Sequence, residues 1–186
     1  MDDEFGIEDA YEQVKMGNWD AVFVSWSRDP VFARRCAHFV KASSGWTFLH
    51  QAAFFGYEHA CRKLIGLGAP VTANARNGQT PIDVAKSQGH DDIVHLLEHA
   101  ASSAKAPVWK PPADASTLPS SSLWDEAVEK HAKEDMLVSY GGGIVGIRQG
   151  DQYFTDSFGR VLVGWHGTYD PPCDMGGYSM IRRPCP

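Results

Sequence analysis

The sequence has few cysteines, and none of them form a close pair. Its four cysteines are Cys36, Cys61, Cys173 and Cys185, which include no C-x-x-C motif. A disulfide framework or a structural zinc site requires cysteines at matched spacings, and this scatter fits neither. We interpret the four residues as reduced thiols and expect neither a metal nor another cofactor.

The chain also lacks an excess of positive charge. It has 17 Lys and Arg against 23 Asp and Glu, so its formal net charge is −6. The two signs are interspersed, and no basic patch of the kind that neutralises phosphates is present in the sequence. We therefore expect no nucleic-acid partner.

Long apolar runs are missing as well. No stretch approaches the ~20 apolar residues that a membrane-spanning helix needs. The first residues, MDDEFGIEDAYEQ, are acidic and lack the apolar core of a secretory signal or the basic character of a mitochondrial presequence. We expect a cytoplasmic or nuclear protein that does not contact a membrane.

The apolar residues that the chain does have are sufficient for a folded core. They make up 43% of 186 residues, which suits one ordinary domain or two small ones. Disorder of the whole chain is therefore not expected.

An internal repeat is present within the first hundred residues. The segment GWTFLHQAAFFGYEHACRKLIGLGAP aligns with GQTPIDVAKSQGHDDIVHLLEHAAS at a separation of 33 positions. The matching pairs are Gly45 with Gly78, Thr47 with Thr80, Leu49 with Ile82, Ala52 with Ala85, Gly56 with Gly89, and Leu64 with Leu97.

The recurring residues have definite structural roles. In each copy the threonine can cap a first helix through its hydroxyl, and the second glycine can end that helix with a positive φ. The alanine between them is small enough for close helix packing. Asn77-Gly78 is a strong turn signal between the two copies.

Both copies resemble the ankyrin repeat, which is a β-turn followed by two antiparallel helices. The strings T-F-L-H-x-A and T-P-I-D-x-A are similar to the family's T-P-L-H-x-A, and the period of 33 is that of the family. The resemblance implies a short stack of helix-turn-helix units over residues 1–100, with repeats at 45–77 and 78–100.

The upstream segment resembles a degenerate first repeat at about residues 5–44. IEDAYEQVKMGNWDAVFVSWS predicts two short helices hinged at Gly17. This glycine lies 39 positions before Gly56, whereas the family's period is 33, so the unit carries about six additional residues. We place them within RDPVFARRCAHFVKASS.

The resemblance also indicates a binding surface. In ankyrin repeats the residue after the turn glycine and the two residues after the paired small residues project toward a concave binding face. An exposed aromatic patch there would mark an interaction site. The positions concerned are Trp46, Phe54 and Phe55 in one repeat, and Gln79, Ser87 and Gln88 in the next.

The aromatic residues have a second interpretation. Phe48 replaces the family's proline, so this repeat departs from the pattern. The inserted segment of the first repeat, or the carboxy-terminal part of the chain, could cover Trp46, Phe54 and Phe55 from within. Both interpretations remain open at this point.

Beyond residue 100 the composition changes. Residues 101–121 are rich in Ala, Ser and Pro and predict a linker. In residues 122–186 the string SLWDEAVEKHAKED predicts a helix capped by Ser122, and MLVSY, IVGIRQ, QYFTD and RVLVGWH predict an antiparallel meander. The whole chain is therefore expected to be α+β, an ankyrin stack followed by a small helix-plus-sheet element.

Two carboxy-terminal motifs bear on chemistry. The string GGGIVG satisfies G-x-G-x-x-G, but it leads into a strand-like segment and not into a helix that could receive a phosphate. The string WHGTYDPPCDMGGY gathers His166, Asp170, Cys173 and Asp174. Cys173 and His166 could be a nucleophile and its base, and the four residues together could be metal ligands. The spacing of these residues is diagnostic neither of a catalytic site nor of a metal site.

The sequence thus predicts a monomeric, non-enzymatic protein-interaction module or adaptor that binds another protein through the concave ankyrin face. One alternative is an enzyme or ligand-binding protein with a site around His166 and Cys173. Another is recruitment of an extended peptide by an open edge of the carboxy-terminal sheet.

Overall fold

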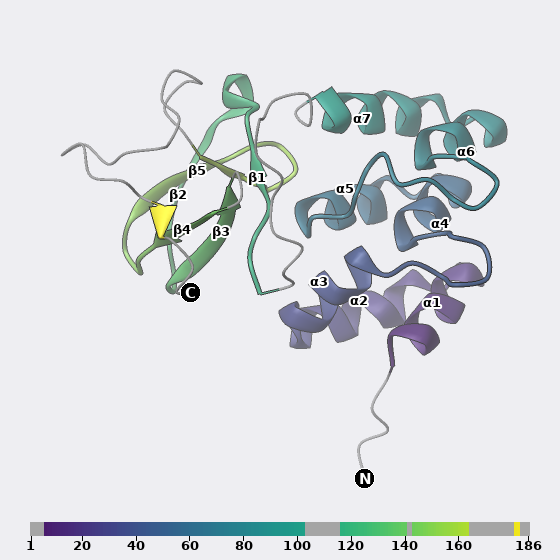
Figure 1. Cartoon of the computed structure of the whole chain (residues 1–186), viewed down its shortest axis with the longest axis horizontal. Helices are drawn as coiled ribbons and strands as arrows, with labels where there is room; N and C mark the ends of the chain where they lie inside the picture. The colour runs from purple at the N-terminus through teal and green to yellow at the C-terminus, as the bar shows by residue number, and fades with distance from the viewer. Residues whose placement is uncertain (1–5, 103–115, 141–142, 164–180, 183–186) are drawn as a thin grey trace, which may run out of the picture. The chain divides into compact units, whose positions relative to one another are not determined.

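The computed structural model describes residues 6–102, 116–140, 143–163 and 181–182. The chain divides into two compact units, Met1–Ala101 and Ser102–Pro186. The first contains helices and the second contains short strands (Figure 1). We call them the helical unit and the β unit.

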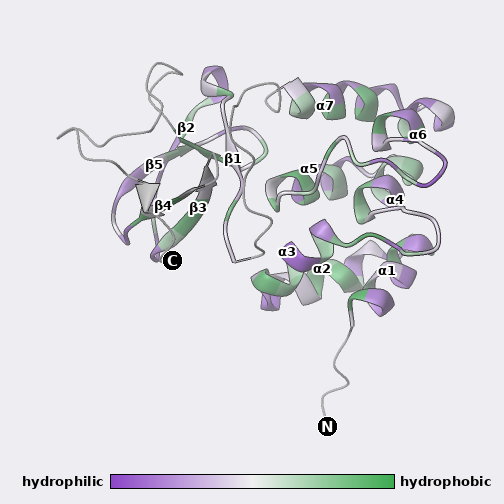
Figure 2. Cartoon of the chain, in the orientation of Figure 1, coloured by the Kyte–Doolittle hydropathy of each residue, from purple (hydrophilic) through white to green (hydrophobic). Residues whose placement is uncertain are grey.

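The described part of the helical unit contains seven helices, arranged as a stack in which α4 and α5 lie between the first three helices and the last two (Figure 1). In Figure 2 these helices carry both apolar and polar residues, as expected for helices buried on one face. Their bounds are α1 (Ile7–Lys15), α2 (Trp19–Arg28), α3 (Pro30–His38), α4 (Phe48–Phe55), α5 (Glu58–Gly66), α6 (Pro81–Gln88) and α7 (Asp91–Ser102).

The two repeated segments fold as their recurring residues predict. The Thr47 hydroxyl accepts a hydrogen bond from the third residue of α4, and the Thr80 hydroxyl does the same for α6. Gly56 and Gly89 end these helices with φ values of +68° and +74°. Each copy is therefore a capped helix, a left-handed glycine and a second helix.

The segment before the repeats contains the expected hinge and one additional helix. Gly17 separates α1 from α2 with a φ of +83°. The inserted segment forms α3, which begins with Pro30 at its first turn. The Asp29 carboxylate caps it by accepting hydrogen bonds from the backbone N–H groups of Val31 and Phe32, both at 2.9 Å.

Phe48, which departs from the family pattern, joins the first three helices to the repeats. Its side chain is fully buried at the start of α4. Ring centroids lie 5.3 Å away for Tyr11, 5.9 Å for Trp26 and 6.0 Å for Phe39. Aromatic contacts at these separations add to the stabilisation from buried area, so the missing proline is replaced by packing.

The β unit contains two sheets, with strand orders β1-β6-β5-β2 and β3-β4-β7. The expected strands at MLVSY, IVGIRQ, QYFTD and RVLVGWH are present, although the last is short. The elements are β1 (Ser120–Ser121), a 3-10 turn η2 (Trp124–Glu126), β2 (Val128–His131), β3 (Met136–Tyr140), β4 (Gly143–Ile147), β5 (Gln152–Thr155), β6 (Val161–Leu162) and β7 (Ile181–Arg182).

The prediction of a helix from Ser122 was wrong. After η2 the chain enters β2, and all four residues of β2 pair antiparallel with β5. The composition favours a helix, but pairing with a distant strand overrides local propensity. Trp124 contacts Phe154 of β5 at a centroid distance of 6.0 Å, and Ala132, just after β2, enters the core.

The prediction of a single antiparallel meander was also wrong, because β4 and β5 belong to different sheets. Strand β5 pairs with both β2 and β6, and β1 pairs with β6 in parallel. The turn between β5 and β6 is held by the buried Asp156 carboxylate. It accepts from the backbone N–H groups of Phe158 and Arg160 and from the Arg160 Nε–H at 2.8 Å.

Part of the expected linker belongs to the β unit. The Leu118 N–H donates to the Leu137 carbonyl at 2.8 Å, and the Ser139 N–H donates to the Leu118 carbonyl at 2.9 Å. Strand β1 follows at once, while residues 101 and 102 continue α7. Residues 103–115 lie outside the described part of the chain.

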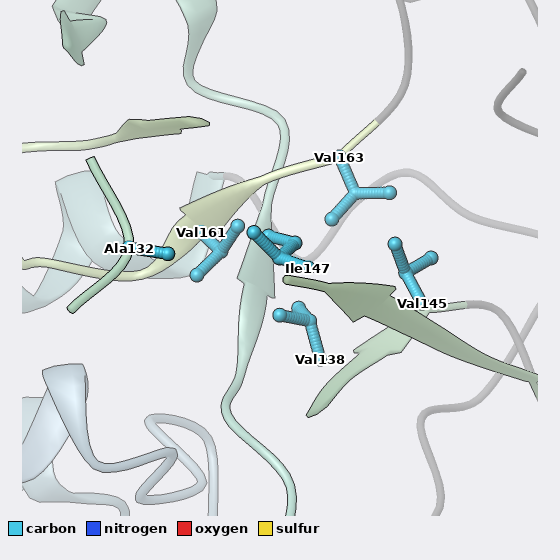
Figure 3. Packing of buried hydrophobic residues seen from close by; sticks show 6 residues of the cluster. All are labelled: Ala132, Val138, Val145, Ile147, Val161 and Val163. Carbon is cyan, nitrogen blue, oxygen red and sulfur yellow. The ribbon is translucent and has the colours of Figure 1, made fainter. Parts of the chain in front are cut away.

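A small aliphatic core holds the β unit together. Figure 3 shows side chains from β3, β4 and β6 converging on this core. Its buried members are Ala132, Val138, Val145, Ile147, Val161 and Val163. None of the described helices, all of which are short, combines the length and apolar character needed to cross a membrane.

Gly45 and Gly78 provide a matched test of the packing between the repeats. Both have positive φ, +74° and +80°, but a Cβ on Gly45 would lie 2.7 Å from the Arg76 backbone nitrogen, whereas a Cβ on Gly78 would meet nothing within 4 Å. We expect Gly78→Ala to lower the free energy of unfolding by about 1–2 kcal/mol through its left-handed backbone.

Gly45→Ala should lower the free energy of unfolding by about 1–3 kcal/mol more, because the backbone around Arg76 must also move. Urea unfolding of the two variants measures the difference. Equal losses in both variants would contradict the close approach seen at Gly45.

Candidate partner-binding surface

Trp46 lies just before α4, and Phe54 and Phe55 lie at the end of that helix. The three rings nevertheless form a continuous series of contacts. Ring centroids are 6.0 Å apart for Trp46 and Phe54 and 5.2 Å apart for Phe54 and Phe55. Phe54 is 37% exposed, and the other two side chains are half-buried. We call these three residues the aromatic patch.

The loop before α4 holds Trp46 in a defined position. Its backbone N–H donates to the Ser44 hydroxyl at 3.2 Å, and its carbonyl accepts from the Lys41 N–H at 2.8 Å. The Trp46 ring stacks on the His50 ring with centroids 5.6 Å apart and planes inclined by 28°. Backbone hydrogen bonds and the stacking on His50 therefore both hold Trp46 in place.

The contacts of the patch bear on whether the chain itself covers these residues. Within the described ranges, their ring contacts go to one another, to His50 and to Tyr57, which stacks on Phe55 at 5.7 Å. Phe39, which follows the inserted helix, packs instead on Tyr11 and Phe48. The inserted segment therefore contributes no ring to the patch.

The three polar positions of the next repeat lie in and just before α6, the helix packed against α4. Ser87 and Gln88 are exposed and Gln79 is half-buried. The Ser87 hydroxyl donates to the Val84 carbonyl at 2.8 Å, and the Gln79 N–H donates to the Asn77 side chain at 3.1 Å. All six predicted site residues therefore belong to two adjacent repeats.

His50 ties the two repeats together from within. Its side chain is fully buried. The Thr47 N–H donates to His50 Nδ1 at 3.1 Å, so this nitrogen must present a lone pair, and the ring proton is assigned to Nε2. Nε2 then donates to the Gln79 carbonyl at 3.1 Å.

The hydrogen bond that His50 Nδ1 accepts from the Thr47 N–H requires a neutral imidazole. Burial lowers the pKa of His50 below its ordinary value of 6.5, with the Gln79 carbonyl acting in the opposite direction. In the next repeat Asp83 takes the same place and bonds to Thr80, so the capping function is retained. These contacts give His50 a structural role.

His90 forms a second tie that the sequence analysis missed. Its Nε2 donates to the Phe54 carbonyl at 3.1 Å, and its ring lies against Gly56. A Cβ on Gly56 would lie 2.8 Å from that ring. The recurring glycine was visible in the sequence, but only the folded chain shows which side chain approaches it.

Comparison with known proteins gives the same assignment of the helical unit. A family model described as ankyrin repeats (3 copies) matches residues 30–106. The helical unit therefore contains ankyrin repeats from residue 30 on, and we call it the ankyrin stack. The match begins at the first residue of α3, so α1 and α2 lie outside it.

Curated relatives match part of this chain. Calmodulin-binding transcription activator 3 of Arabidopsis thaliana is 37% identical over 83 residues, which are 41% of this chain and 8% of that protein. Rabankyrin-5 of mouse and of human are 42% and 44% identical over 57 residues, 31% of this chain and 5% of each relative. The chain therefore spans less than a tenth of the length of these relatives.

The chemical alternatives fall largely outside the described residues. His166 and Cys173 are among the residues the structure does not describe, as are Gly141 and Gly142 of the glycine-rich string. The rest of that string lies in β4, which is a strand and not a helix N-terminus. The described ranges contain no group of three His, Cys, Asp or Glu placed to hold a metal.

Two cysteines lie in the described ankyrin stack. Cys36 and Cys61 are buried free thiols. Burial raises the pKa of Cys36 to about 11 and that of Cys61 to about 12. Both are therefore protonated and unreactive at neutral pH.

The neutral His50 makes stability depend on pH. Because the folded-state pKa lies below 6.5, the unfolded chain binds the proton first as pH falls. Stability is fully present above about 6.5 and is lost below it, by at most about 1.4 kcal/mol per pH unit for this group.

We expect His50→Gln to flatten this dependence and also to lower stability at pH 7.5. Urea unfolding between pH 7.5 and 5 measures both effects. His95→Gln on α7 removes an exposed histidine of the same stack and serves as control. A wild-type slope in His50→Gln would show that His50 does not set the dependence.

Proposed function

We propose that this chain is a non-enzymatic interaction module or adaptor that binds a partner protein through the aromatic patch and the polar positions beside it. Ankyrin repeats generally serve as protein–protein interaction modules, which supports the class. The observation that carries the proposal is the set of ring contacts that joins Trp46, Phe54 and Phe55. These rings are partly exposed, and the loop before α4 and the His50 ring hold Trp46 in place.

The patch has the physical properties of an energetic anchor. Aromatic side chains that are already ordered lose little conformational entropy on binding. An apolar side chain of the partner would bury the exposed part of Phe54, with Trp46 and Phe55 as its flanks. Gln79, Ser87 and Gln88 would supply polar contacts at the rim.

We further propose that the partner is another protein and not nucleic acid, that the chain acts as a monomer, and that it works in the cytoplasm or nucleus. The formal charge of −6 supports the first point. Ankyrin stacks carry many unrelated specificities, so the fold does not define the partner.

Phe54→Ala is the variant that tests the proposal, because Phe54 is the most exposed ring of the patch and its loss leaves the packing of Trp46 on His50 in place. We expect this variant to weaken the binding of specific partners by tenfold or more, which is about 1.4 kcal/mol of binding free energy, as for a hot-spot residue. Quantitative affinity capture with wild-type and variant chains measures this loss.

Phe23→Ala is the matched control, since it removes a half-buried aromatic ring from α2 instead of α4. Thermal melting of all three proteins checks that each is folded. The same partners at the same recovery with Phe54→Ala would overturn the proposed surface.

A further inference from the structure

The ankyrin stack has a hollow that shares no residue with the aromatic patch. Its volume is about 710 Å³, and it is lined by the start of α1, by one face of α2 and by α3. Its apolar lining comes from Ile7, Val24 and Phe32. We call it the α2–α3 groove.

The groove exists because the inserted segment forms a helix. The Asp29 cap turns the chain directly from α2 into α3, so the two helices are adjacent. Val24 and Arg28 are four residues apart on α2, and Phe32 and Arg35 are three apart on α3, so each pair lies on one helix face. Each helix thus supplies one large apolar side chain and one guanidinium to the groove, and α2 adds the small Ala21.

The apolar lining is partly exposed to solvent. Val24 is 52% exposed, and Ile7 and Phe32 are half-buried. Scattered exposed apolar residues need no explanation, but these three line one hollow whose size falls within the roughly 300–1,000 Å³ of ligand sites.

The charge of the groove is opposite to that of the chain. Arg28 and Arg35 are exposed, and in the described part of the structure neither lies within ion-pair distance of a carboxylate. The groove also contains Asp29, but its Oδ1 is engaged by two backbone N–H groups of α3. Each arginine lies in the last turn of its helix, a position that favours a cation but does not account for the apolar side chains that line the same hollow.

We infer that the α2–α3 groove binds an acidic peptide segment of a partner protein, one that carries a bulky apolar side chain between carboxylates. The apolar side chain packs against Val24 and Phe32, while each guanidinium can bind a carboxylate through two parallel hydrogen bonds. This site is independent of the aromatic patch, so either can fail without the other.

The test uses the full chain and three fluorescein-labelled peptides of twelve residues, measured by fluorescence anisotropy. The first has leucine and phenylalanine at its centre with glutamate and aspartate on both sides. The second has alanine in place of the two apolar residues, and the third has lysine in place of the acids. We expect the first to bind at least tenfold more tightly than either of the others.

The double variant Arg28→Glu/Arg35→Glu should weaken the binding of the first peptide by tenfold or more, and Arg28→Gln/Arg35→Gln should weaken it by a smaller factor. Val24→Glu should weaken it as well. The matched control Arg62→Glu/Lys63→Glu reverses two cations on α5 and should change binding less than twofold. The substituted residues are exposed except for Lys63, which is half-buried, and circular dichroism checks that each variant is folded.

Three outcomes would overturn the inference. One is equal binding of the acidic and basic peptides, or none of the acidic one. Another is an equal loss in the groove variants and in the α5 control. The third is self-association of the wild-type chain in sedimentation velocity that Arg28→Glu/Arg35→Glu abolishes, since a second copy would then occupy the groove.

Discussion

The burial of α4 is the constraint on which the ankyrin stack depends. Six of its eight residues are buried, and it packs against helices on both sides in the stack. Its start is tied to the next repeat by the His50 imidazole and its end by His90. Gln51 adds a buried hydrogen bond to the Tyr11 hydroxyl at 2.9 Å. Buried polar groups must be hydrogen-bonded, so these bonds also favour this one arrangement of the helices around α4.

The position of the aromatic patch follows from this burial. Because α4 is held at both ends, the rings at those ends are ordered before any partner arrives. The inserted helix α3 gives the same stack a groove of different charge. The groove has two guanidiniums beside its apolar side chains, whereas the aromatic patch has neutral polar side chains beside it. Two surfaces on one small stack would allow it to join two proteins, which is the property expected of an adaptor.

Much of the ankyrin stack could be predicted from its sequence, and much of the β unit could not. Thr47, Gly56 and their counterparts act within a few residues, so their pattern predicts the local structure directly. The β unit depends on pairing between distant segments, such as Val128 with Thr155. A string that favours a helix became β2 for that reason. The approach of His90 to Gly56 was likewise invisible in either residue alone.

By itself, the sequence determined the repeat, its capped helices and the hinge at Gly17, since these follow from local sterics and a constant period. The six candidate contact residues follow from the resemblance to ankyrin repeats and stay a prediction. Tertiary structure decided that the inserted residues form α3, that Trp46 stacks on a neutral His50, and that Arg28 and Arg35 flank an apolar groove. These features arise where elements meet, and close packing of particular side chains has no short-range signature in sequence.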